Sequence, residues 1–255
     1  MSDTATGGSG AAEQKKSRAL GALPILALMI SFAAMRWFAM STAAPYRAVL
    51  PDAWMRGSAL GLTRLAINAV ACVLFLVVLP GCVVRLRDRE EGWWSATVSR
   101  VVRTGSPPGG GWWWPIGPLV SIAVGVGAAQ AIPSICSAYP IYRDACLGLG
   151  RRTLVAEGAY AVILLATELY YRGALLVAMR SMIGGWALPA MAMICAMDHA
   201  GAPAAEWVTS GVGAWVLGWI ALRSRSIWPG YALHLGLAWG ADAGCCAAVF
   251  WPGTG

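Results

Sequence analysis

The stretch AYAVILLATELYYRGALLVAM, residues 159–179, decides the fold, because it is apolar over a membrane-crossing length yet contains two opposite charges. About 20 apolar residues are enough for a helix to cross the hydrocarbon core of a bilayer. Glu168 and Arg172 stand four residues apart, so on a helix they share one face and can pair. A charge inside a span costs about 2.5–3.5 kcal/mol on insertion scales, so this pair needs a structural or functional reason.

The composition places most of the chain in lipid. The 255 residues are 58% hydrophobic and only 12% charged, whereas soluble domains have about 25% charged residues. Apolar runs recur along the whole sequence. We therefore predict an all-α, polytopic transmembrane helix bundle of about seven spans, at 19–40, 64–84, 117–137, 153–179, 186–199, 205–222 and 227–250.

The basic residues predict the orientation of the bundle. The net charge is +7, but Lys and Arg fall between apolar runs, which favours a topology signal over nucleic-acid binding. Three basic segments lie on one side of a seven-span bundle, which places the N-terminus in the cytoplasm. Their residues are Lys15, Lys16 and Arg18, then Arg85, Arg87, Arg89, Arg100 and Arg103, and finally Arg223 and Arg225.

The chain divides into three predicted parts. Residues 1–18 are polar and small and predict a disordered cytoplasmic tail. Residues 19–149 contain the N-terminal spans with a long cytoplasmic loop at 85–114, and residues 150–255 form a C-terminal helix core that contains Glu168 and both histidines. Cys136 and Cys146 are near enough in sequence to meet in an external loop. Most of the seven cysteines are expected to pack as small apolar residues.

Three ionisable side chains have similar predicted depths. We take Arg180, Gly185 and Ser226 as the cytoplasmic edges of their helices. With a rise of about 1.5 Å per residue, Glu168 then lies roughly 18 Å into the membrane, His199 roughly 21 Å and His234 roughly 12 Å. These are the only two histidines of the chain. The spacing permits all three to meet in one pocket, and we adopt that convergence as a hypothesis.

Such a set suits hydrolysis of a peptide bond. A buried glutamate can take a proton from water, imidazole N–H groups can stabilise an oxyanion, and Arg172 can orient Glu168. The same Glu168, His199 and His234 are an alternative zinc set of the open catalytic type, although the preferred mechanism requires no cofactor. Glu206 follows His199 and falls near the positive end of the next helix. For Glu206 we favour a favourable interaction with the positive end of the helix over a role in the reaction. We retain Glu206 among the candidate catalytic residues.

The motifs resemble the CPBP family of intramembrane proteases, also called the Abi or CAAX prenyl-protease family. The family's EExxxR motif is occupied by TELYYR, which places Thr167 at the first glutamate. Its FxxxH motif appears as Cys195-Ala-Met-Asp-His199, and its HxxxN motif as His234-Leu-Gly-Leu-Ala238. The string HAGAPAAE also resembles a family variant with Gly-x-Pro-x-x-Glu after the histidine. The resemblance covers roughly residues 150–240.

The resemblance implies cleavage of a membrane-anchored protein or peptide substrate in the lipid bilayer. In the family the first glutamate of the pair is usually the water-activating base, so here Glu168 is the carboxylate left for that role. The composition resembles that of bacterial proteins, which favours the bacterial inner membrane and a sorting or maturation protease of the myxosortase-like branch over prenylated substrates. Two alternatives remain: a non-catalytic relative with an immunity or scaffolding role, and a proton-coupled transporter.

Overall fold

All regular structure that can be described in this protein is helical. The computed structural model describes residues 26–34, 57–79, 82, 113–137, 139, 146, 150–199 and 204–250, and no strand occurs within these ranges. In the same ranges two stretches are long and apolar enough to cross a membrane, Gly61–Val78 and Arg151–Asp198. The all-α prediction is confirmed for this part of the chain. The predicted tail at 1–18 and nearly all of the 85–114 loop lie outside it.

Each predicted span contains a described helix. The first is an unlabelled helix over 26–34. The others are α3 (Gly57–Val73) with η2 (Leu74–Val78), α6 (Trp113–Ala131) with η3 (Pro133–Ser137), α7 (Arg151–Glu168), η5 (Leu169–Leu175), α8 (Leu176–Ile183), η6 (Gly184–Trp186), α9 (Ala187–Asp198), α10 (Ala204–Ser224) and α11 (Trp228–Phe250).

The expected span at 186–199 contains a short helix. Helix α9 has 12 residues, which corresponds to about 18 Å, whereas the hydrocarbon core is about 30 Å thick. This helix is therefore too short to cross a bilayer alone. Its apolar composition had suggested a span, but helix length decides whether a helix can cross.

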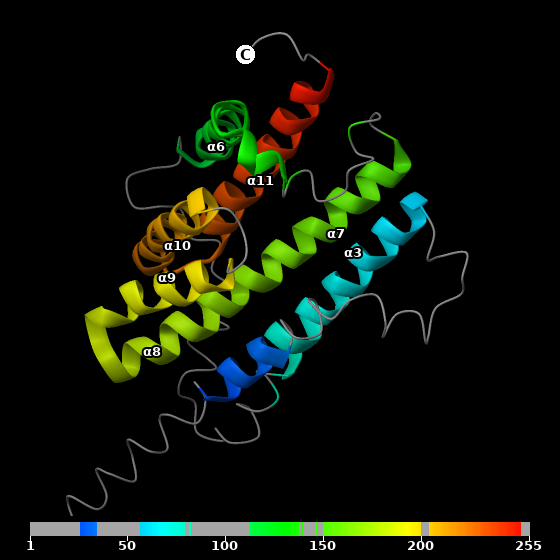
Figure 1. Ribbon diagram of the computed structural model, residues 1–255. Helices are drawn as coiled ribbons and strands as arrows, with labels where there is room; N and C mark the ends of the chain where they lie inside the picture. Colours follow the sequence, from blue (N-terminus) through cyan, green and yellow to red (C-terminus); the bar gives the residue numbers. More distant parts are fainter. Residues whose placement is uncertain are drawn as a thin grey trace, which may run out of the picture.

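Helices α7 and α8 form one rod, joined by the π-helix η5, and α3 runs beside α7 (Figure 1). Within the π-helical turn the amide of Leu176 donates to the carbonyl of Tyr171, five residues earlier. The run 170–176 is buried without interruption, because η5 contacts η2, α9 and α10. Its outer side is covered as well, since the Tyr170 hydroxyl donates to the carbonyl of Leu28 at 3.1 Å. Single π-helical turns inside α-helices often mark functional sites.

Two tight reversals lie at the same end of the bundle. The first is at Gly184, whose φ of +57° suits glycine because it has no Cβ. The second is at Arg225, with φ of +53°, next to Ser226, whose hydroxyl accepts from the amide of Trp228 at the start of α11. Helix α9 runs back along α8, and α10 runs back along α9. The first residue of α7 and the last residue of α11 therefore lie at the end of the bundle opposite to these reversals.

Helices α6 and α11 pack backbone against backbone. Gly236, Gly240 and Gly244 recur every four residues on α11. A Cβ at Gly240 would collide with the backbone of Ile122 on α6, and one at Gly244 would lie within 3.0 Å of the backbone of Val126. Small residues at this spacing let membrane helices approach closely. Glycine is therefore required for this pairing.

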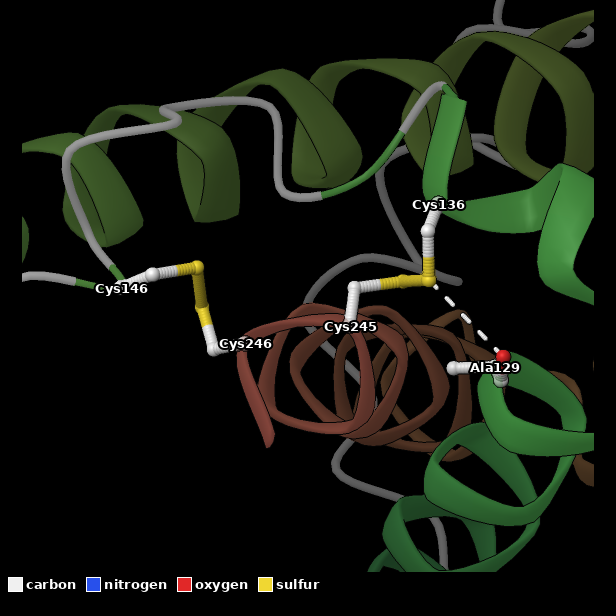
Figure 2. The surroundings of a disulfide bond; sticks show 5 residues. All are labelled: Ala129, Cys136, Cys146, Cys245 and Cys246. Atoms are coloured by element: carbon white, nitrogen blue, oxygen red, sulfur yellow. Dashed lines mark hydrogen bonds between the residues drawn. A yellow bond between two sulfur atoms is a disulfide. The ribbon is translucent and has the colours of Figure 1, made fainter. Parts of the chain in front are cut away.

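Two disulfides fasten the segment after α6 to the end of α11 (Figure 2). Cys136 is bonded to Cys245, and Cys146 is bonded to Cys246. The expected meeting of Cys136 with Cys146 does not occur. The adjacent pair at the end of α11 takes both partners instead, so Cys136 and Cys146 are each bonded to that helix.

Candidate active site

Glu168 is the centre of the candidate active site. It is the last residue of α7, and its side chain has no solvent exposure. Its Oε1 accepts a hydrogen bond from Arg172 Nη1 at 2.9 Å and another from His234 Nδ1 at 2.8 Å. Arg172 is itself only 2% exposed. Two donors on one oxygen hold this carboxylate in a fixed orientation.

The approach of α11 to Glu168 depends on its first turns. Tyr231, three residues before His234, donates its hydroxyl to the carbonyl of Ala161 at 3.2 Å, which fastens α11 to α7. A Cβ at Gly230 would lie 3.4 Å from Glu168 Oε2, so glycine leaves room for the carboxylate beside this helix. Among the described residues, Oε2 receives no hydrogen bond. Oε1 of Glu168 therefore accepts two hydrogen bonds, whereas Oε2 accepts none from the described residues.

His234 connects the buried carboxylate to a cavity of about 520 Å³ between α6, α10 and α11. The His234 side chain is 30% exposed and forms part of the cavity wall. The rest of the wall is almost entirely apolar, with the hydroxyl of Ser121 as a further polar group. Such a cavity fits an apolar chain and presents one imidazole to it. Its other lining residues include Pro118, Val124, Val216, Leu217, Leu233 and Leu237.

His199 belongs to a second pair. It follows the last residue of α9, and its Nδ1 lies 3.0 Å from Oε1 of Glu206 in the first turn of α10. The side chains of His199 and Glu206 are 34% and 18% exposed. Tyr139 lies nearby: burial raises the pKa of its phenol, a hydrogen bond from Tyr160 opposes that rise, and the charges of Glu206 and Asp242 add to it.

The three residues expected to converge are thus divided between two pairs: Glu168 with His234, and His199 with Glu206. No hydrogen bond joins Glu168–His234 to His199–Glu206 within the described chain. Cys195, one turn before His199, lies close enough to Glu168 and Arg172 to interact electrostatically with both. In the described ranges no three His, Cys, Asp or Glu side chains are grouped closely enough to hold a metal ion. The alternative zinc set of Glu168, His199 and His234 is not grouped in these residues, and we derive no step through a metal.

The positions that depart from the family motifs have clear local environments. The hydroxyl of Thr167 donates to the carbonyl of Leu164 in its own helix at 2.8 Å. Cys195 is buried in the core around η5, as a packing residue would be. Ala238 is 4% exposed and packs with Tyr160 and Leu164. Neither Thr167 nor Ala238 offers an acid or an amide to the site.

Several features of the site could not be predicted from the sequence. The cavity wall supplied by α6, the contact of Gly230 with Glu168, and Tyr139 near Glu206 all depend on helix pairing. The recurrence of glycine at 236, 240 and 244 is a sequence signal that could have predicted the close approach of another helix to α11.

Comparison with known proteins supports the expected family resemblance. Residues 152–240 match the family model described as "Type II CAAX prenyl endopeptidase Rce1-like". This range contains both carboxylate–imidazole pairs and agrees with the resemblance expected over 150–240. No curated protein and no solved structure matches the chain significantly. The Rce1-like family consists of membrane proteases, which implies a membrane-associated protein substrate. Over residues 152–240 the chain is therefore similar to the Rce1-like family of type II CAAX prenyl endopeptidases.

Proposed function

We propose that the protein is an intramembrane endopeptidase that hydrolyses a peptide bond of a membrane-anchored protein, with Glu168 activating the water. The observation that supports this most directly is the carboxylate of Glu168. It is fully buried and receives hydrogen bonds from Arg172 and His234 on the same oxygen, within the segment that matches a protease family.

The two oxygens of Glu168 have different roles in this mechanism. Oε1 is held by its two donors, and Oε2 takes a proton from water. The oxygen of that water then bonds to the carbonyl carbon of the substrate, the carbon–nitrogen bond breaks, and the amine leaves with a proton. A protonated His234 ring donates from Nδ1 to Glu168 and presents its Nε2–H to the oxyanion.

The cavity supplies the substrate site in this proposal. Its apolar wall accepts the apolar part of a membrane-anchored chain, and His234 marks the place where a carbonyl meets the catalytic groups. Lipid-facing helices on either side allow entry from the bilayer. The substrate class that we favour is a C-terminal sorting anchor or a precursor awaiting maturation, in a bacterial inner membrane.

The proposed membrane arrangement has about seven helical segments with the N-terminus in the cytoplasm. The two disulfides support this orientation, because disulfides persist on the oxidising side of a membrane. They lie where α6 and α11 end and α7 begins. Arg223 and Arg225 lie at the opposite end, which is the side that the distribution of basic residues assigns to the cytoplasm.

The test is cleavage by the purified protein in nanodiscs. The probe is a library of fluorescence-quenched peptides that carry an apolar, membrane-inserting stretch, with new termini identified by mass spectrometry. We expect Glu168→Gln to lower kcat by at least about 10²-fold, the usual contribution of a general base. Thr167→Ala is the matched control on the same turn and should retain near wild-type activity. Cleavage at the wild-type rate by Glu168→Gln would reject the proposal.

A second candidate is a non-catalytic relative that binds membrane proteins without cleaving them. Two observations favour it: the hydroxyl of Thr167 is bonded within its own helix, and Ala238 is packed in an apolar cluster. Such a protein would cleave no member of the library. Its phenotype would also survive Glu168→Gln wherever the variant accumulates to the wild-type level.

A further inference from the structure

We propose that Glu206 is a positioning residue that fixes the proton on Nδ1 of His199, so that Nε2 of this ring delivers a proton to the leaving amine. The inference rests on the proposed endopeptidase function and adds a proton donor to it. It assigns a role in the reaction to the second carboxylate–imidazole pair, which stands apart from Glu168.

The contact between the two side chains determines which nitrogen is free. A carboxylate only accepts hydrogen bonds, so the Nδ1 that lies 3.0 Å from Glu206 Oε1 must carry the proton. That bond defines the tautomer and the orientation of the ring. Nε2 is then the nitrogen that exchanges a proton with other groups. At 34% exposure, the ring can be reached by another molecule.

Dipole compensation accounts for only part of this arrangement. A carboxylate anywhere in the first turn of α10 would interact favourably with the positive end of that helix. It would not need to meet a particular side chain. Glu206 instead contacts a ring seven residues earlier in the chain, on a different helix. The contact therefore has either a role in the reaction or a purely structural role. The two roles predict different behaviour of the His199 ring.

The chemistry of the proposed reaction calls for such a donor. Glu168 takes one proton from water on Oε2, and the amine nitrogen needs a proton as the carbon–nitrogen bond breaks. Thr167 supplies no acid beside it. In the proposed step, protonated His199 gives its Nε2 proton to the amine nitrogen as the carbon–nitrogen bond breaks. The proton that Glu168 took from water returns to His199 through solvent, so protons and charge balance.

The histidine content of the chain permits a direct measurement. With only two histidines, protein labelled with ¹⁵N-histidine gives two sets of ring signals in nanodiscs, which His234→Gln assigns. We expect Nδ1 of His199 to be protonated in the wild type. In Glu206→Leu, which has a similar size and no acceptor, this proton should move to Nε2, the preference of free imidazole. The His234 signals should stay unchanged and so report an intact fold.

Two further variants make the measurement decisive. Thr209→Ala removes a hydroxyl that donates to the backbone carbonyl of Glu206 at 3.2 Å and leaves the carboxylate in place, so both histidine signals should match the wild type. Glu206→Gln keeps an acceptor and should keep the Nδ1 proton, which provides the test if Glu206→Leu does not fold. An Nδ1 of His199 that is unprotonated in the wild type would overturn the inference.

The activity measurement separates this inference from the proposed function. With the same peptide library, Glu206→Leu should lower kcat by about 10²-fold while KM stays within about twofold. A Glu206→Leu protein that has lost the Nδ1 proton yet keeps its wild-type kcat refutes the role of Glu206 and leaves the endopeptidase proposal standing. If the wild type cleaves nothing, the endopeptidase proposal fails, and the ¹⁵N signals still decide whether Glu206 positions His199.

Discussion

At the scale of single residues, the protein keeps a charged carboxylate in a fully buried site by surrounding one oxygen with donors. Removing an ion from water is expensive, and the attraction between partners repays that cost only with good geometry and further hydrogen bonds. Glu168 has both, from Arg172 Nη1 and His234 Nδ1. Arg172 also lies over the ring of Tyr171, 5.7 Å from its centroid. The buried carboxylate of Glu168 is thus stable only while Arg172 and His234 both donate to it.

This dependence predicts the effect of Arg172→Met. The variant leaves the buried carboxylate without its cation, so we expect a loss of about 3–5 kcal/mol in stability, measured as thermal unfolding in detergent. The double variant Glu168→Gln/Arg172→Met removes both charges and should recover most of that loss. Equal destabilisation in the single and double variants would show that packing by the arginine side chain, and not its charge, supports the site.

At the scale of helices, α6 and α11 both line the cavity and are packed closely against each other at the glycines of α11. The apolar runs predicted where helices occur, and each predicted range contains one. They did not predict the π-helical turn η5, because hydropathy is insensitive to hydrogen-bond register. They also missed the disulfide partners of Cys136 and Cys146, since Cys245 and Cys246 are about a hundred residues further along the chain.

The glycine contacts give a prediction for α11. In Gly240→Ala the new Cβ meets the backbone of Ile122, so the two helices must separate, and we expect a loss of about 1–3 kcal/mol. Gly127→Ala on α6 is the matched control, because nothing lies within 4 Å of a Cβ there. It should leave the unfolding temperature unchanged or raise it slightly. Equal effects of the two variants would contradict the close packing.

At the scale of the whole molecule, the two ends of the bundle differ chemically. Both disulfides lie at one end, and the reversals at Gly184 and Arg225 lie at the other. The sequence predicts a depth for Glu168, His199 and His234 from position along a helix, and that depth stays a prediction. It did not predict their division into two pairs, because the direction in which each side chain points depends on how the helices pack.

The asymmetry of the bundle predicts its orientation. Arg151 and Arg225 are both exposed and lie at opposite ends. In a Cys82→Ser background, which removes an exposed free thiol, a membrane-impermeant maleimide applied to intact cells should label Arg151→Cys. It should label Arg225→Cys only after lysis. The reverse pattern would place the disulfides on the cytoplasmic side and contradict the proposed topology.

The most direct test of the central claim, that Glu168 and His234 act as one catalytic unit, is a double-mutant cycle on kcat/KM with the peptide library. The three variants are Glu168→Gln, His234→Gln and the protein with both changes. Residues that act as a unit are strongly non-additive. The double variant should therefore be no slower than the slower single variant. Losses that multiply, so that the double variant falls by the product of the two single effects, would contradict the account.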